Sequence, residues 1–533
     1  MPVEEAGYRR WLGLVAIALG VAMIVVDTTI VNVITPAVIE DLGINSTQAQ
    51  WIQESYAIVF AALLLIFGRV ADLIGARRVF AVGVVVFGVT SLLAGLAPSG
   101  EVLILARFLQ GVGGAMLLPT SLSLLNQTFR GKERGQAYAV WGSTIGAATA
   151  VGPVIGGWFA EHASWRWAFG INVPLVVLIF ILTVVFITPS PRSAGRIDVP
   201  GALLSVAGLG ALAYGLVEGR TYGWVTSIRG ADVAGLSPVF LALIVAAVTL
   251  TLFVLRQIRL SRSGQPLMDT RLFRIASFRN GNLATVIIGL GEFGIVAVLP
   301  LWLQFTLGYS SLQAGAALVP LAIGSFVANG MSFGLAEKLS ALSFVRLGLA
   351  LEAAALAALA VVAATTSAPW WSIAIAMFVY GIGVGFATAQ VTNVVLADVP
   401  PTEAGQGSGI QSTFRQLGSA LGIAVLTTIF FSALGNQVKD TLTTNGQFPA
   451  DQIDRYAATV TDSAGAAIAP LAADPATATV ADAARTAMAD GIALGSAIAA
   501  GLLLLGLVAT LLIPATRRTR DEEPAPQEAE PVH

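Results

Sequence analysis

The sequence predicts an all-α polytopic membrane protein with about fourteen transmembrane helices. Of its 533 residues, 56% are hydrophobic and 11% are charged, whereas a soluble protein carries about a quarter charged residues. The mean hydropathy is +0.80, and apolar stretches of about 20 residues recur along the chain. Helices are expected because a lone lipid-exposed strand leaves its backbone polar groups unsatisfied.

The apolar stretches place the spans in order. The first begins near Trp11 and exceeds the roughly 7–15-residue core of a signal peptide, so we expect a membrane helix there. The predicted spans cover 11–35, 49–70, 78–97, 102–126, 136–160, 167–188, 199–218, 235–256, 280–306, 314–335, 343–364, 370–396, 405–434 and 488–514. The segment 435–487 is too polar to span, and an amphipathic external hairpin and a disordered loop both fit it. The charged, proline-rich tail 516–533 is predicted to be disordered.

An internal repeat divides these spans into two halves. Residues 111–140 align without a gap on residues 381–410, in the same direction along the chain. The identical pairs are Gly111 and Gly381, Gly113 and Gly383, Glu133 and Glu403, Gly135 and Gly405, and Gln136 and Gln406. A parallel duplication of this kind predicts two six-helix bundles, in 1–190 and 276–515. The two spans within 191–275 are then an insert between the bundles.

The positive charges predict the orientation of the chain in the membrane. An even number of spans puts both termini on one side, and that side holds 21 of the 29 Lys and Arg residues, against 6 on the other. Because Lys and Arg accumulate in cytoplasmic loops, both termini are predicted to be cytoplasmic, in the cell membrane of a prokaryote.

The composition also excludes several kinds of chemistry. The chain has no cysteine, and its two histidines, His162 and His533, lie outside the predicted spans. Intramembrane proton transfer must therefore use Asp or Glu. No Gly-x-Ser-x-Gly elbow and no nucleotide-binding loop is found, so neither a membrane-embedded enzyme nor an ATP-driven pump is expected. We expect no cofactor, no metal and no nucleic-acid partner.

Ionisable residues inside the spans are the candidate functional groups, because such residues are costly in a bilayer and usually functional. Asp27, in VVDTTIVNV, is predicted to lie roughly 12 Å from the outer end of its helix. It should face a wet cavity or a partner, as a proton site, a cation site or both; the alternative is a structural hydrogen bond. Arg107 stays charged, so it would either tune a nearby carboxylate or form a fixed ion pair.

Three further acids lie in the spans. Glu54 would be a second acid in the cavity or, as we favour, a residue at its mouth that contacts water. Glu292, flanked by glycines near the midplane, is the second functional candidate, and Arg415 could pair with it or with Glu352. Four aromatic residues could line an apolar pocket, although we favour lipid contact or helix packing for any one of them; they are Phe60, Trp141, Trp302 and Phe305.

Several motifs resemble those of the major facilitator superfamily. GRVADLIGARRVF, at 68–80, resembles the loop signature between the second and third helices, through Gly68, Asp72, Gly75 and Arg77. LILARFLQGVGGA, at 103–115, resembles the fourth-helix motif. AVGPVIGG, at 150–157, resembles the fifth-helix motif of antiporters, through Gly152, Pro153, Gly156 and Gly157. The stretches VDTTIVNV, SWRWAFGINVP and LPLWLQ resemble the fourteen-helix drug:proton antiporter branch.

The resemblance implies two bundles that rock around a central cavity and couple proton entry to drug expulsion. It gives Arg107 a role in proton transfer and makes Asp72 a conformational latch against the helix starting near Gly405; the alternative for Asp72 is a turn-forming residue. Glu352 would lie at the bundle periphery, facing lipid or pairing between helices. The expected partners are protons, the bilayer and an amphipathic, often cationic compound, bound by a monomer. The alternative cargo is a lipid, a glycolipid or one dedicated metabolite.

Overall fold

The computed structural model describes residues 3–129, 131–190, 192, 197–227, 235–263, 266–335, 339–364, 368–400 and 404–513. The described part is helical, with one isolated antiparallel bridge between Thr226 and Leu236 and no strand. Thirteen helices are long and apolar enough to cross a membrane. The remaining predicted span, 136–160, corresponds to α5, which packs along α1. The predicted tail 516–533 lies outside the described residues.

The N-terminal bundle comprises the helices up to Phe186. They are α1 (Val3–Leu42), α2 (Ser46–Ile74), α3 (Ala76–Gly95), α4 (Gly100–Thr128), α5 (Gly131–His162), α6 (Trp167–Gly170) and α7 (Asn172–Phe186). The short α6 leads into α7, and together they form one span. Close helix pairs in this bundle are α2 with α4, α3 with α4, and α1 with α5.

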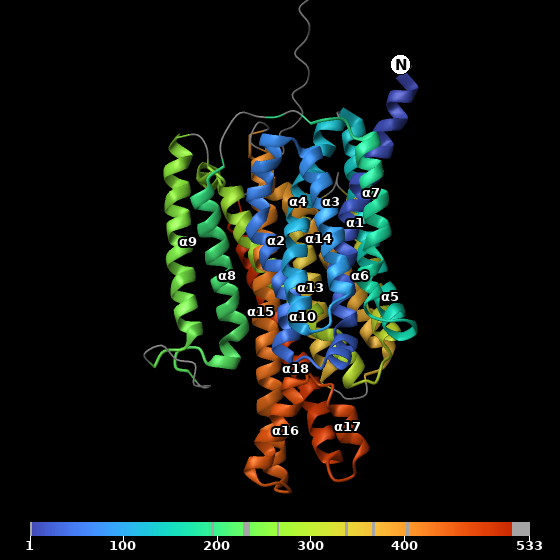
Figure 1. The fold of residues 1–533 in the computed structure, drawn as a ribbon, viewed down its shortest axis with the longest axis vertical. Helices are drawn as coiled ribbons and strands as arrows, with labels where there is room; N and C mark the ends of the chain where they lie inside the picture. The colour runs from blue at the N-terminus through green and yellow to red at the C-terminus, as the bar shows by residue number, and fades with distance from the viewer. Residues whose placement is uncertain are drawn as a thin grey trace, which may run out of the picture.

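The C-terminal bundle repeats this arrangement, and two inserted helices lie between the bundles in sequence. The inserted helices are α8 (Val199–Tyr222) and α9 (Pro238–Ser263), followed by the 3-10 helix η1 (Thr270–Arg274). The bundle contains α10 (Ala276–Phe305), α11 (Ser311–Ala317), α12 (Val319–Leu335), α13 (Ala341–Ala363), α14 (Trp370–Leu396), α15 (Ala404–Asn445) and α18 (Ala478–Thr510). In Figure 1, α8 and α9 stand beside the two bundles at one edge of the molecule.

The segment 435–487 is helical rather than a loop. Helix α15 continues to Asn445, α16 (Ala450–Asp462) and α17 (Ile468–Ala473) follow, and α18 begins at Ala478. Lys439 of α15 pairs with Asp454 of α16 at 2.7 Å, and α16 buries its apolar face. Of the two alternatives from the sequence, the structure therefore has the amphipathic hairpin, which projects at the end opposite the N-terminus (Figure 1).

The helices are longer than the hydropathy pattern indicates. Helix α1 reaches Leu42 instead of residue 35, and α2 begins at Ser46, where Asn45 caps its first turn, instead of residue 49. Hydropathy detects the part of a helix that contacts lipid, and the backbone continues helical into the polar region. Apolar side chains on α3, α7 and α9 are exposed, as expected of lipid-facing surfaces; they include Val89, Val177, Ile181, Val248 and Leu252.

The two bundles contact each other at the end that carries α16 and α17. Among the described residues, every hydrogen bond between the bundles lies there: Gln50 to the Ala424 carbonyl, Gln304 to the Val33 carbonyl, and the Leu312 N–H to Glu161. The structure is thus closed at the end opposite the N-terminus.

Candidate functional site

Asp27 is held by a closed network of polar side chains inside the N-terminal bundle. Arg107 of α4 donates to its Oδ2 at 2.5 Å, Gln110 of α4 donates to its Oδ1 at 2.7 Å, and Asn172 of α7 donates to the same oxygen at 3.2 Å. Ser91 of α3 accepts from both amides. All five side chains are buried. Side chains from four helices therefore form one network around this carboxylate.

Arg107 connects this network to α2. Its Nε donates to the Ile52 carbonyl at 3.2 Å, and its guanidinium lies 4.4 Å from the centre of the Tyr56 ring. The Arg107 charge compensates that of Asp27, and cation–π contact adds to the pairing. Every charge and every Asp27 oxygen in the network has a partner, as a buried ion pair requires.

The depth of Asp27 in its helix and the packing around it both differ from the sequence-based prediction. The carboxylate lies 15 residues before the end of α1, so it is about 22 Å from that end instead of the predicted 12 Å. Its face of α1 is packed, not wet, because Asp27 is 0% exposed. Gln110 and Asn172 were not singled out from the sequence as ligands of Asp27. The spacing from Arg107 was the available signal for Gln110, since residues i and i+3 share a helix face.

The acids of the C-terminal bundle have far fewer partners. Glu292, in the middle of α10, accepts one hydrogen bond, from Thr388 at 3.3 Å, and Tyr380 donates to its backbone carbonyl at 2.8 Å. Glu352 of α13 is 0% exposed, and neither of its oxygens has a hydrogen-bond partner in the described part of the chain. Arg415 of α15 is near enough to act electrostatically on both acids, but no described carboxylate lies within 4.0 Å of it.

Three predictions about individual residues are corrected by this geometry. Glu352 does not face lipid, because it is buried between α13 and α14, against Gly383. Glu54 is not a mouth residue that contacts water: it is 0% exposed, and neither oxygen has a described partner. Trp302, expected along a cavity, is 0% exposed and belongs to the hydrophobic core in this state.

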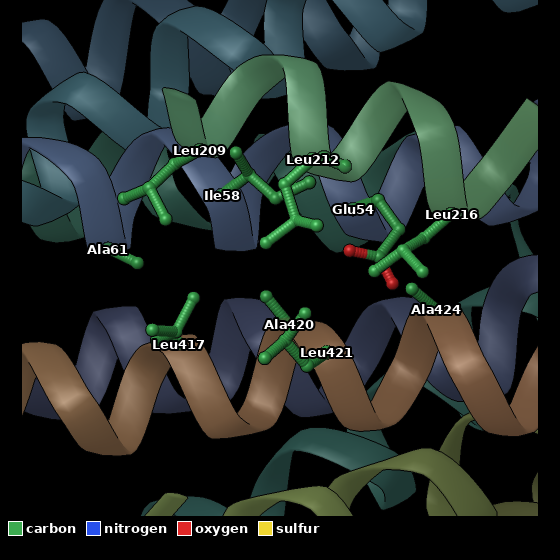
Figure 2. Close-up of a pocket in the computed structure, with 11 residues that line it drawn as sticks. Glu54, Ile58, Ala61, Leu209, Leu212, Leu216, Leu417, Ala420, Leu421 and Ala424 are labelled. Carbon is green, nitrogen blue, oxygen red and sulfur yellow. The ribbon is translucent and has the colours of Figure 1, made fainter. Parts of the chain in front are cut away.

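Glu54 lies at the junction of the two bundles. Together with α8 and α15 it encloses a cavity of about 20 Å³, room for about one water molecule. Figure 2 shows the Glu54 carboxylate in the gap between α8 and α15, beside Leu216 and Ala424. The other lining residues are apolar: Ile58, Ala61, Leu209, Leu212, Ala213, Leu417, Ala420 and Leu421.

The loop signature lies at the opposite end of α2. Asp72 is 56% exposed in its side chain and is 4.0 Å from Arg69. Arg77 donates instead to the Val184 carbonyl at 2.6 Å, at the end of α7. Gly75 adopts a φ of +99°, which a residue with a side chain would adopt only with strain. Gly68 lies on α2 toward Pro119 of α4.

The fifth-helix motif contacts both bundles. Gly152 and Gly156 lie against α1, next to Thr29 and Ile30. The Pro153 carbonyl and Gly157 lie against α11 of the other bundle. Small residues allow helix backbones to approach this closely. The motif therefore lies where α5 contacts α1 and α11 together.

Comparison with known proteins identifies the class to which this fold and these sites belong. The family model of the Major Facilitator Superfamily matches residues 17–423, and the chain belongs to this family. It is a multi-pass membrane transporter fold with two six-helix bundles and two inserted helices.

Two of its relatives are bacterial export proteins. The chain is 30% identical to the tetracenomycin C resistance and export protein of Streptomyces glaucescens, over 99% of this chain and 95% of that one. It is 31% identical to the multidrug efflux pump LfrA of Mycolicibacterium smegmatis, over 93% and 94%. It also shares the fold of a bacterial homologue of the lysosomal transporter Spinster, with a TM-score of 0.61 and 17% identity, over 94% of this chain and 96% of that one.

Proposed function

We propose that this protein is a proton-coupled antiporter that exports amphipathic, cationic drugs or toxic compounds across the cytoplasmic membrane by alternating access. The names of its relatives, which include antibiotic export and multidrug efflux proteins, support drug export. The buried Asp27–Arg107 pair supports proton coupling, and it is the observation on which the proposal chiefly rests. The proton gradient supplies the energy, so the protein acts as a transporter without a cofactor and not as an enzyme.

The proposed role of the Asp27 network follows from its balance of charge. With Asp27 ionised, Arg107 is compensated and holds α1 to α4 and α2. A proton on Asp27 removes that compensation and leaves Arg107 with only its neutral contacts. Because an uncompensated buried charge is costly, protonation favours a rearrangement in which Arg107 reaches water. Asp27 thereby converts proton binding into a movement of three helices.

Glu292 is proposed as the second acid of the cycle and, with Arg415, as part of the substrate cavity. It lies at the middle of α10 and accepts one side-chain hydrogen bond from the described residues. Glu352 adds a second buried acid nearby, so acidic groups outnumber basic groups at this depth of the C-terminal bundle. That excess suits protons and organic cations.

The orientation and the latch also belong to the proposal. The distribution of positive charge supports a cytoplasmic location for the end with the N-terminus, and the closed end then faces outside. Asp72 is then cytoplasmic, and we propose that it meets the N-terminus of α15 when the cytoplasmic side closes, where the helix dipole favours a carboxylate. The protein acts as a monomer in this scheme.

Transport into everted vesicles tests the proposal. Vesicles with the unaltered protein should accumulate a cationic dye when a proton gradient is imposed and lose it when the gradient is collapsed. Asp27→Asn should abolish uphill accumulation. Full uphill transport by Asp27→Asn would exclude the proposed role of Asp27. An unchanged drug susceptibility together with an altered envelope lipid profile would instead favour a lipid or one dedicated metabolite as cargo.

A further inference from the structure

Glu54 is a buried acid that the scheme above leaves unused, although it lies at the contact between the bundles. We propose that Glu54 is a second proton-binding site and that the outer contact between α2, α8 and α15 closes only over its protonated form. This inference rests on the proposed proton coupling and adds to it the step at which the outer side closes.

The Glu54 carboxyl has no compensating group among the described residues. Its side chain is 0% exposed, and within the described ranges no group donates to either oxygen. The cavity that receives the carboxylate is lined by apolar side chains and has room for about one water molecule. An ionised carboxylate left without partners in such a place is strongly disfavoured, whereas its neutral form is tolerated.

The cavity at Glu54 lies where the two bundles and the insert meet. Its walls come from α2 of the N-terminal bundle, α15 of the C-terminal bundle and the inserted helix α8 (Figure 2). Gln50, one turn before Glu54, donates to the Ala424 carbonyl across the contact. Separation of α2 from α15 therefore opens this cavity, and water then stabilises the ionised carboxylate.

The inserted helix α8 forms one wall of the Glu54 cavity and is bonded to both bundles there. Trp51 of α2 donates to Glu218 of α8 at 2.8 Å, and Thr428 of α15 donates to the Leu216 carbonyl at 3.3 Å. Leu209, Leu212 and Leu216 then cover the junction from the side. One helix thus binds both bundles at the level of Glu54. In this proposal the insert has the function of limiting the access of water and lipid to the acid.

The other charged groups around Glu54 are already engaged or lie further along their helices. Arg107 of α4 is paired with Asp27 of α1, and Glu218 of α8 accepts from Trp51. Arg415 of α15 lies nine residues before Ala424, about 13 Å along the helix. The groups on the elements packed against this part of α2 are Asp27, Tyr56, Arg107, Tyr214, Glu218 and Arg415. None of them forms a hydrogen bond with Glu54 in the described structure.

The proposal predicts the direction in which the closed fraction of the protein changes with pH. The closed outer side binds the Glu54 proton more tightly than the open one, so the closed fraction must fall as the pH rises. For a single site, the ratio of closed to open protein falls by at most about tenfold per pH unit. In the cycle, the outward-facing protein closes only after it has taken a proton from outside, which prevents uncoupled closure.

The experiment uses the absence of cysteine from the chain. Ala163→Cys and Ala364→Cys, both exposed, receive spin labels, and the distance between them is measured in lipid nanodiscs from acidic to mildly alkaline pH. With Glu54 in place, the closed population should decline with rising pH. With Glu54→Gln, a neutral residue of the same shape, it should stay closed at every pH.

Glu101→Gln is the matched control, because Glu101 is an exposed acid at the same end of the molecule; it should behave as the unaltered protein. A pH response of Glu54→Gln equal to that of the unaltered protein, or no pH response in either, would overturn the proposal. The readout requires no transport, so it is independent of the proposed function. A pH-driven closure without proton-driven dye uptake would leave the Glu54 site standing and refute the antiporter.

Discussion

The Asp27 network of the N-terminal bundle and the two acids of the C-terminal bundle are held in opposite ways. In the N-terminal bundle, Asp27 accepts three side-chain hydrogen bonds and is paired with Arg107. In the C-terminal bundle, Glu292 accepts one, and Glu352 accepts none in the described structure. A network in which the charged groups have hydrogen-bond partners holds helices together. A buried acid with few partners is instead stabilised when its surroundings change and offer new ones. The comparison indicates that the Asp27 network holds the helices of the N-terminal bundle together. The C-terminal acids instead respond to a proton or a substrate that enters the bundle.

The largest expected effect comes from breaking the satisfied network. Arg107→Ala leaves Asp27 buried without its counter-charge and should lower the free energy of unfolding by about 3–5 kcal/mol. Thermal unfolding of the purified protein, followed by fluorescence, measures it. Arg166→Ala removes an Arg–Asp pair with Asp41 that is exposed to solvent, and it should cost less than about 1 kcal/mol. Equal losses in the two variants would contradict the comparison.

For Glu352, which lacks described partners, the comparison predicts a change of the opposite sign in the free energy of unfolding. Glu352→Met replaces a buried carboxyl without described partners by an apolar side chain of similar length. It should raise the free energy of unfolding by about 1–3 kcal/mol, because the cost of burying an unpaired polar group disappears. The same unfolding assay applies. A destabilisation of Glu352→Met by a similar amount would show that Glu352 has a structural partner.

Removal of a single hydrogen bond to Asp27 or to Glu292 should give the smallest changes in the free energy of unfolding. Gln110→Leu removes donation to Asp27 and to Ser91 and should cost about 1–2 kcal/mol, near the upper range for helix contacts in membranes. Thr388→Val removes the 3.3 Å bond to Glu292 and should cost about 0.6 kcal/mol. A larger loss of unfolding free energy for Thr388→Val than for Gln110→Leu would contradict the comparison.

The sequence was sufficient for the spans and for the two-bundle architecture, because both depend on hydropathy and on a repeat that can be read along the chain. It also marked Asp27, Arg107 and Glu292 as candidates, since a charge in an apolar run is visible without a structure. It could not show that Glu54 and Glu352 are buried without hydrogen-bond partners among the described residues. Burial of that kind depends on which helices pack together, and hydropathy carries no information about neighbours.

The insert illustrates the same limit. Residues 199–218 were recognisable as a span, but nothing in their composition indicates that α8 lies across the contact of α2 and α15. The polar segment 435–487 left two alternatives open, and its helical form depends on contacts such as Lys439 with Asp454. Both features are tertiary, and both needed the structure.

Proton release on substrate binding tests the central claim, that Asp27 carries the exchanged proton, most directly. Purified protein in weakly buffered solution receives a panel of cationic and neutral compounds, and the released protons are measured with a pH indicator. The unaltered protein should release protons on addition of cationic compounds, and Glu292→Gln should release fewer. Asp27→Asn should release few or none while still folding and binding. Release from Asp27→Asn equal to that of the unaltered protein would contradict the account.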